Sequence, residues 1–117
     1  MAISNDLLRG HTETIILAQL KNGDNYGYEI SKAIETLSMG QLVLKDATLH
    51  TVFRRMEQSG LIESYWGDGD AGARRRYYRI TDAGRNFYEN NKTNWFETAE
   101  ILKNLILGGK KNADRTL

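Results

Sequence analysis

The chain lacks cysteine altogether in its 117 residues. Disulfide bonds and thiolate metal sites are therefore excluded, and the composition fits a reducing cytosol. No apolar run approaches the roughly 20 residues that a membrane-spanning helix needs, and we expect no signal peptide. We therefore expect a soluble protein of the cytoplasm.

Net charge is also nearly absent, because 16 basic side chains face 15 acidic ones. The total charge therefore indicates little about the partners of the protein. The distribution says slightly more, since residues 45–79 carry seven basic and five acidic side chains and form the most basic third. The length suits one domain, which at this size buries about two-thirds of its chain surface.

Residue patterns of enzyme and metal sites are missing as well. The two histidines, His11 and His50, are isolated and have no metal-ligand spacing. Gly67, Gly69 and Gly72 lead into no helix, so they do not form a phosphate-binding loop. No Ser/His/Asp set can be singled out. We expect neither an enzyme nor a bound cofactor or metal.

What is present is a regular series of elements. Ser4 or Asn5 is placed to cap a helix that runs to about residue 22, and its second half is apolar on more than one side. A turn follows at residues 23–25 and a second helix at 27–37, after which Gly40 ends the segment. Residues 42–44 are too few for more than an extended link or a small strand.

The stretch from 46 to 60, DATLHTVFRRMEQSG, predicts a third helix and is the most informative part of the chain. Asp46 is placed to cap its start, and Gly60 can adopt the left-handed conformation that ends a helix. Spacings of three and four residues line one apolar stripe, made of Leu49, Val52, Phe53 and Met56. The opposite face carries small hydroxyls and arginines, which suit hydrogen bonds to base edges and phosphates: Thr48, Thr51, Arg54 and Arg55, with His50 at its edge.

After residue 60 the pattern changes to strands. Residues 61–66 and 74–80 are β-branched and aromatic runs, and residues 67–72, which separate them, include three glycines. This pattern predicts a β-hairpin with a mobile tip. Trp66 is expected to pack the hairpin against the helical body. Thr81 is placed to cap a long last helix from Asp82 to about residue 107, followed by a frayed tail.

The order of three helices and a hairpin is that of a winged helix-turn-helix. Four segments resemble, in order, the motifs of PadR-family transcriptional regulators: residues 26–30 (YGYEI), 47–50 (ATLH), 54–62 (RRMEQSGLI) and 74–84 (RRRYYRITDAG). The match covers most of the first 85 residues. The single C-terminal helix resembles the compact branch of that family and is similar to the lactococcal multidrug-resistance regulator. His50 departs from the family pattern, which usually has tyrosine there, and Ala47 replaces a residue that is often glycine.

The resemblance implies a mainly α fold with a small β-hairpin. Residues 1–81 would form the winged helix-turn-helix DNA-binding domain, whose first helix also contributes to the dimer. Residues 82–108 would form the C-terminal dimerisation helix, and residues 109–117 a flexible tail. Members of this branch are dimeric repressors whose long last helices pack against the first and last helices of the partner.

The third helix and the hairpin supply the expected DNA contacts. Lys45 can reach a backbone phosphate, and strand alternation points Arg74 and Arg76 to one face and Arg75 to the other. The alternative for this triplet is a solvated edge strand. We expect Arg55→Ala and Arg75→Ala to weaken operator binding and to flatten its salt dependence. The complete expected set is Lys45, Thr48, His50, Thr51, Arg54, Arg55, Arg74, Arg75 and Arg76.

The last helix carries a second expectation. Tyr88, Trp95 and Leu102 recur every seven residues, which is typical of a coiled-coil-like seam, and a plain dimer interface would explain them. Trp95 and its copy across a two-fold axis would alternatively frame a slot for a planar aromatic ligand. The resemblance implies that slot, but Ala99 stands where the lactococcal regulator has an acid, so a preference for cationic compounds is not expected. The lining residues implied by the resemblance are Leu7, Leu8, Thr14, Ala18, Tyr88, Asn91, Trp95 and Ala99.

The sequence therefore predicts a homodimeric, sequence-specific transcriptional repressor that binds an inverted-repeat operator and that a planar aromatic ligand near Trp95 would release. The competing class is a dimeric small-molecule-binding or protein-interaction module that keeps the winged fold without reading DNA. Near-neutral charge and the carboxylates of Asp68 and Asp70 support that class, since they would repel phosphates. A third interpretation keeps DNA binding and makes Trp95 a packing residue only.

Overall fold

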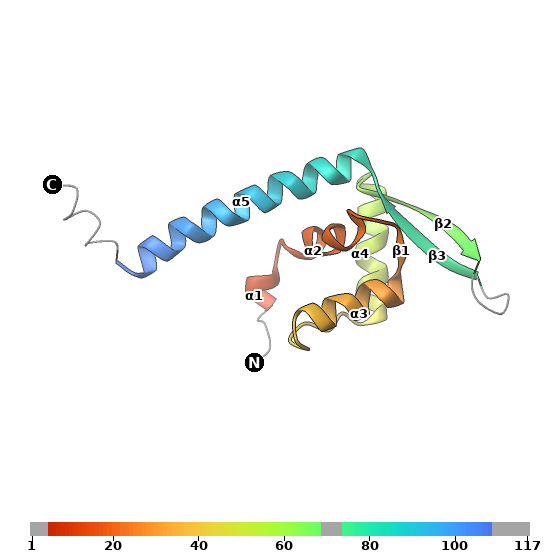
Figure 1. The fold of residues 1–117 in the computed structure, drawn as a ribbon, viewed down its shortest axis with the longest axis horizontal. Helices are drawn as coiled ribbons and strands as arrows, with labels where there is room; N and C mark the ends of the chain where they lie inside the picture. The colour runs from red at the N-terminus through yellow and green to blue at the C-terminus, as the bar shows by residue number, and fades with distance from the viewer. Residues whose placement is uncertain (1–4, 69–73, 109–117) are drawn as a thin grey trace.

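The computed structural model describes residues 5–68 and 74–108, and the expected hairpin tip and C-terminal tail lie largely outside these ranges. The chain is mainly helical, with one small three-stranded antiparallel sheet, and α5 leaves the body as a long arm (Figure 1). This is the predicted winged helix with a C-terminal helix. Its elements are α1 (Asn5–Leu8), α2 (Thr12–Leu20), β1 (Asn25–Tyr26), α3 (Gly27–Leu37), α4 (Asp46–Gln58), β2 (Ile62–Asp68), β3 (Arg74–Ile80) and α5 (Asp82–Ile106).

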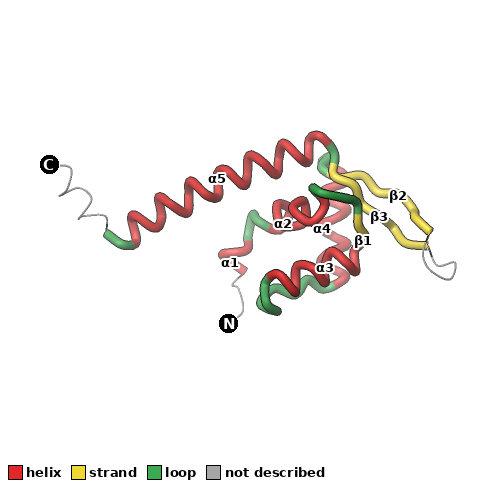
Figure 2. The backbone as a smooth tube through the Cα atoms, in the orientation of Figure 1, coloured by secondary structure: helices red, strands yellow, loops and turns green. Residues whose placement is uncertain are grey.

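The N-terminal segment differs from the single helix that was predicted. It is broken into α1 and α2 at residues 9–11, and α2 ends at Leu20, two residues before the expected end (Figure 2). Gly10 adopts φ +84°, a conformation that only glycine accepts readily, and the His11 N–H donates to the Leu8 carbonyl at 2.9 Å. Because of this break, α1 and α2 do not share one helical axis.

The core lies between α2, α3, α4 and the sheet. Phe53 of α4 is 1% exposed and stacks on Tyr78 of β3, with ring centroids 4.0 Å apart. Ile16 and Leu17 of α2 and Ile30 of α3 are fully buried. The predicted apolar stripe of α4 is confirmed, since Leu49, Val52, Phe53 and Met56 are all buried. This packing orients α4 with its polar face outward.

Of the two predictions for the ends of α4, one is wrong and one is confirmed. Lys45, not Asp46, is the N-cap, and it makes no side-chain capping hydrogen bond. The cap predicted at Asp46 is therefore wrong; the helix begins at Asp46, whose carboxylate lies in the first turn and complements the helix dipole. The stop at Gly60 is confirmed by its φ of +77°.

The sheet contains one strand more than the predicted hairpin. β1 pairs antiparallel with β3 through Asn25–Tyr78 and Tyr26–Tyr77, although the residues around Asn25 were expected to form only a turn. β3 also pairs with β2, so the strand order is β1-β3-β2. Residues 42–44 form no strand and serve as an extended link. β1 thus fastens the start of α3 to the hairpin.

The joint between the sheet and α5 is short and tightly packed. The predicted cap is confirmed, because the Thr81 hydroxyl oxygen accepts the Gly84 N–H at 2.9 Å. The same hydroxyl donates to the Gly60 carbonyl at 2.6 Å. Gly84 itself packs against the Leu61 carbonyl oxygen, where a Cβ would collide with backbone. The direction of α5 relative to the sheet is fixed by these contacts.

Beyond its first turns, α5 has little to pack against. Gly84 and Tyr88 are its buried residues, whereas Trp95 and Leu102 are each 49% exposed and Leu105 is 70% exposed. Among the described helices, none combines the length and the apolar character needed to cross a membrane. The distal half of α5 therefore exposes large apolar side chains that the described part of the chain does not cover.

Candidate functional site

The outward face of α4 is the first candidate surface. Lys45, Thr48, His50, Thr51 and Arg54 are all exposed, as the sequence predicts. Thr51 donates its hydroxyl to the Ala47 carbonyl at 3.0 Å. In residues 5–68 and 74–108 the structure gives Arg54 neither an ion pair nor a hydrogen bond. The Arg54 guanidinium is therefore free for an anionic partner.

Gln58 belongs to this face and was not singled out from the sequence. It follows Arg54 by four residues, which places the two side chains on the same side of the helix. Gln58 is exposed, and its amide group can both donate and accept hydrogen bonds. The spacing from Arg54 was the signal that could have identified it.

Arg55 lies on the flank of α4 and has a partner. Its Nε and Nη2 atoms donate to Glu13 Oε2 at 3.0 and 2.8 Å. Glu13 belongs to the first turn of α2, and its side chain is only 23% exposed. The pair links α4 to α2, so the Arg55 guanidinium is less available to an outside partner than that of Arg54.

The arginines of β3 divide between the two faces of the hairpin, as strand alternation predicts. Arg74 and Arg76 lie over the Trp66 ring, with guanidinium carbons 5.2 and 5.8 Å from its centroid. Arg75 lies over the Tyr26 ring at 4.7 Å, on the other face. The three charges therefore do not form one row.

Arg76 is tied to the helical body. Its Nη2 donates to Ser64 Oγ at 2.8 Å and lies 3.5 Å from Glu57 Oε2, while Ser64 Oγ donates to the same carboxylate oxygen at 2.7 Å. Glu57 is in the last turn of α4. This network joins the hairpin to α4 and offsets the charge of Arg76.

Trp66 does not pack the hairpin against the helical body, and the prediction that it would is wrong. The residue is 55% exposed and its ring contacts the two arginines just described. Trp66 is exposed because α4 ends before it. The last turn of α4 contacts the hairpin through Glu57, whose partners are Ser64 and Arg76. Trp66 lies one step further along the same strand face.

The opposite face of the hairpin carries a cluster of tyrosines. Tyr77 packs between Tyr26 and Tyr65, with centroids 5.5 and 5.8 Å away. The Tyr65 hydroxyl donates to Asp24 Oδ2 at 2.6 Å, and this hydrogen bond is the largest cause that raises the pKa of Tyr65. These contacts hold β1, β3 and β2 together.

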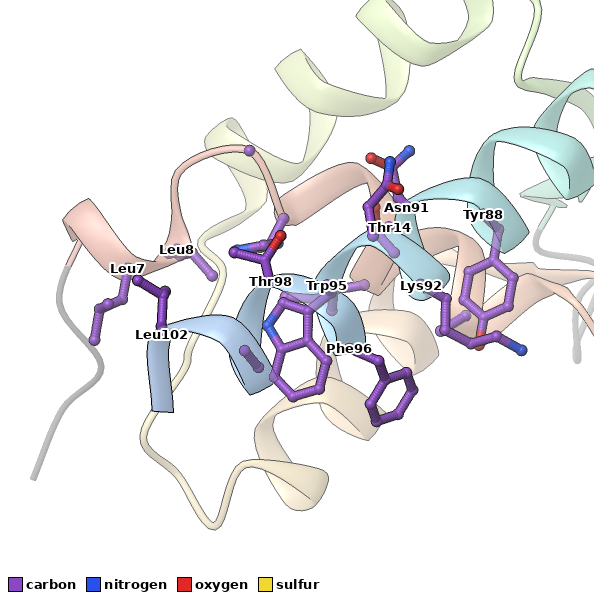
Figure 3. A pocket seen from close by; sticks show the side chains of 16 residues that line it. Leu7, Leu8, Thr14, Tyr88, Asn91, Lys92, Trp95, Phe96, Thr98 and Leu102 are labelled. Carbon is purple, nitrogen blue, oxygen red and sulfur yellow. The ribbon is translucent and has the colours of Figure 1, made fainter. Parts of the chain in front are cut away.

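An apolar groove of about 800 Å³ runs between α1, α2 and the middle of α5 (Figure 3). It contains the whole set of ligand-lining residues expected from the resemblance, although these residues come from three helices. The eight are Leu7, Leu8, Thr14, Ala18, Tyr88, Asn91, Trp95 and Ala99. A groove of this volume lies in the range of small-molecule sites.

The groove wall is mostly apolar with few polar groups. Trp95 packs edge-on against Phe96, with centroids 5.0 Å apart. The Thr14 hydroxyl oxygen is buried and has no hydrogen-bond partner among the described residues. Lys92 lies in the lining, and its hydrogen bond to Glu89 is the largest cause that raises its pKa. The lining residues include no aspartate or glutamate.

Tyr88 is less available than the seven-residue repeat suggests. It is 8% exposed, and Lys21, the C-cap residue of α2, donates to its hydroxyl at 3.2 Å. Arg85 reinforces this junction, since its Nη1 donates to the Lys21 carbonyl at 2.9 Å. Tyr88 therefore anchors α5 within its own chain, and the exposed part of the seam begins at Trp95.

Within the described ranges, no group of three His, Cys, Asp or Glu side chains could hold a metal ion.

Comparison with known proteins gives one family. The family described as "Transcriptional regulator PadR-like family" matches residues 16–90. An uncharacterized protein of Lysinibacillus sphaericus is 40% identical over 100 residues, which cover 86% of this chain and 92% of that protein.

Solved structures agree with this match. A transcriptional regulator from Clostridium thermocellum is 42% identical, with a TM-score of 0.79, and the alignment covers 87% of this chain and 96% of that one. A PadR family transcription regulator from Clostridium difficile is 32% identical, with a TM-score of 0.72 and coverage of 83% and 99%. The similarity thus extends over the fold and most of both chains.

Proposed function

Because the chain belongs to the PadR-like family of transcriptional regulators, we propose that it is a homodimeric repressor that binds an inverted-repeat operator and is released by a planar aromatic ligand. The family is non-enzymatic and regulates transcription through DNA binding. The dimer, the repression, the contact residues and the ligand are the parts that we add.

The uncovered apolar surface of α5 is the observation that carries this proposal. From Trp95 to Leu107 the helix and its C-cap expose seven large apolar side chains, and leaving so many of them in water is unfavourable. A second copy of the same helix would bury them, and stable interfaces bury about 800 Å² on each partner. The residues concerned are Trp95, Phe96, Ile101, Leu102, Leu105, Ile106 and Leu107.

Such a dimer would hold two α4 helices outward as recognition helices. In related geometries the two half-sites lie about one turn of DNA apart or a little more. Arg54 and Gln58 would contact bases or phosphates at the centre of the face, with support from Lys45, Thr48, His50 and Thr51. Arg74 and Arg75 would add contacts from the hairpin. Arg55 and Arg76 would join them only when their carboxylate partners release them.

The groove beside Trp95 supports the ligand part of the proposal. In a two-fold dimer the groove of each subunit would open towards Trp95 of its partner, and two indoles provide flat apolar surfaces for stacking. This arrangement would make the chain similar in mode of action to the compact multidrug-binding branch of the family. A ligand that binds only one arrangement of the subunits would change the separation of the α4 helices, and its differential affinity sets the size of the effect.

The proposal is tested by two measurements on the purified chain. Light scattering gives the oligomeric state, and fluorescence anisotropy measures binding to labelled DNA from upstream of its own gene. We expect a dimer that binds this DNA, and weaker binding for Arg54→Ala than for a surface control such as Lys32→Ala on α3. A monomer would contradict the proposal. A dimer that binds aromatic dyes but no duplex would instead favour the binding-module alternative.

A further inference from the structure

The proposed function leaves one exposed residue without a role, namely Trp66 on the hairpin. The residue is 55% exposed, although tryptophan carries the largest apolar surface of all side chains. Two guanidinium groups flank it, those of Arg74 and Arg76, at 5.2 and 5.8 Å from the ring centroid. An exposed aromatic ring with two cations beside it is a surface suited to a polyanion.

The register of the sheet explains this arrangement. Trp66 lies directly opposite Arg76, and Asp68 lies opposite Arg74. Side chains two residues apart share a face, so Arg74 is the diagonal neighbour of Trp66. Arg76 is bound by Ser64 and Glu57, whereas Arg74 has no hydrogen bond or ion pair within residues 5–68 and 74–108. Its contact with the indole is therefore what orients the free cation.

The face that carries Trp66 is also the one that borders α4. Closer to the body, the same face contributes Tyr78, which stacks on Phe53 of α4. Further out comes the Glu57–Arg76 contact, and beyond it the indole. The opposite face is filled by Tyr65, Tyr77 and the Asp24 hydrogen bond. The other face also has arginines over tyrosine rings, but the face that adjoins the recognition helix carries the more exposed ring, since Trp66 is 55% exposed and Tyr65 is 36% exposed.

We propose that Trp66 is a DNA-contact residue, whose indole packs against a deoxyribose at the edge of the minor groove and orients Arg74 towards the neighbouring phosphate. The inference rests on the proposed DNA binding and adds a contact outside the recognition helix. Apolar side chains and arginines are the groups that proteins place in and beside the minor groove. The indole N–H, which has no acceptor in the described structure, donates to a phosphate or to an acceptor at the groove floor.

The test measures binding of the full-length chain to a labelled mixed-sequence duplex of about 30 base pairs in about 50 mM salt, where phosphate contacts dominate. We expect Trp66→Ala to bind about tenfold more weakly, since one aromatic contact contributes about that much. Trp66→Phe keeps a ring beside Arg74 but loses the indole N–H, so its affinity for the duplex should lie between that of the parent chain and that of Trp66→Ala. Arg74→Ala and Trp66→Ala should reduce the salt slope by similar amounts, because both affect the same phosphate contact.

A second readout isolates Trp66 itself. The chain has two tryptophans, so in Trp95→Phe the emission comes from Trp66 alone, and it should change when the duplex is added. Thermal unfolding of each variant verifies folding, and Trp66→Phe decides the question if Trp66→Ala does not fold.

Two results would overturn the inference in distinguishable ways. If both Trp66 variants bind like the parent chain while Arg54→Ala binds weakly, Trp66 makes no DNA contact and the proposed function stands. If the parent chain binds no duplex at all, the proposed function and this inference fall together.

Discussion

Arg55 of α4 donates two hydrogen bonds to a single carboxylate oxygen of Glu13 in α2, at 3.0 and 2.8 Å. Its neighbour Arg54 has no such partner among the described residues. Two adjacent arginines of one helix are thus in different electrostatic states. The charge of Arg55 is offset by the Glu13 carboxylate, whereas the charge of Arg54 is left unpaired by the described residues and is available to an anionic partner.

This difference predicts unequal effects of two alanine substitutions. Arg54→Ala should weaken duplex binding and lower the salt slope by about one, because it removes one phosphate contact. Arg55→Ala should change the slope less and should instead lower the free energy of unfolding by about 0.2–1 kcal/mol, the range for exposed ion pairs. Binding isotherms at several salt concentrations and urea unfolding separate the two effects. Equal slopes for both variants would contradict the assignment.

Glu13→Gln should have the opposite effect on DNA binding. The substitution keeps the size of the side chain but removes the charge that holds Arg55, so this guanidinium gains freedom to reach a phosphate. We expect tighter duplex binding with a salt slope that is steeper by about one. Glu35→Gln on α3 is a matched control, since Glu35 is exposed and forms no ion pair within the described ranges. Unchanged affinity would show that Arg55 stays away from DNA even when unpaired.

Trp95 should report ligand binding in the groove. In the Trp66→Phe chain, Trp95 is the only tryptophan, and stacking of a neutral planar aromatic dye should quench its emission. Replacing Ala99 of the groove with aspartate should strengthen binding of a cationic dye, because the present lining contains no carboxylate. Emission that no planar dye alters would reject the ligand site and leave Trp95 as a packing residue.

The exposed seam of α5 should control the oligomeric state. Leu102→Lys places a charge in the surface that we propose is buried between subunits, so the dimer should dissociate into monomers at micromolar concentration. Glu100→Lys introduces the same side chain at an exposed charged position two residues away and should leave the dimer intact. Light scattering at several protein concentrations makes the comparison. A dimer that survives Leu102→Lys would move the interface elsewhere.

Gly84 should be intolerant of a side chain although it lies in a helix. A Cβ there would collide with the Leu61 carbonyl oxygen and press on the Ile80 side chain. We expect Gly84→Ala to destabilise the fold by about 1–3 kcal/mol, despite the better helix propensity of alanine. Gly23→Ala is the control, since a Cβ there would meet no atom of the described residues within 4 Å, apart from its own chain neighbours. Urea unfolding measures both variants.

Local chemistry made part of the fold predictable. The bounds of α3 at Gly27 and Leu37, the cap at Thr81 and the stop at Gly60 follow from residues within a few positions of each other. The break at Gly10 was missed because a single glycine is tolerated inside a helical pattern, and nothing nearby marks its positive φ. The strand at Asn25 was missed because it consists of two residues and depends on pairing with Tyr78, far along the chain.

The candidate site was predictable in its composition but less so in its contacts. Helical spacing identified the polar face of α4 around Thr51 and Arg54. The ion pair of Arg55 joins residues 42 positions apart, and no local pattern indicates it. Trp66 was assigned to packing because tryptophan is usually well buried. Its exposure depends on where α4 stops beneath the hairpin, which is a property of the tertiary structure.

The single residue between β3 and α5 has a mechanical consequence. Since β3 ends at Ile80 and α5 begins at Asp82, the hairpin and the C-terminal arm have no hinge of several residues between them. The contacts of Thr81 and Gly84 fix the junction, so the hairpin and α5 should move together as one rigid unit. In the proposed dimer, a small rotation of one α5 helix against the other would then move the ends of both hairpins. The affinity for DNA would depend on the angle between the two α5 helices, which is set many residues away from the hairpins.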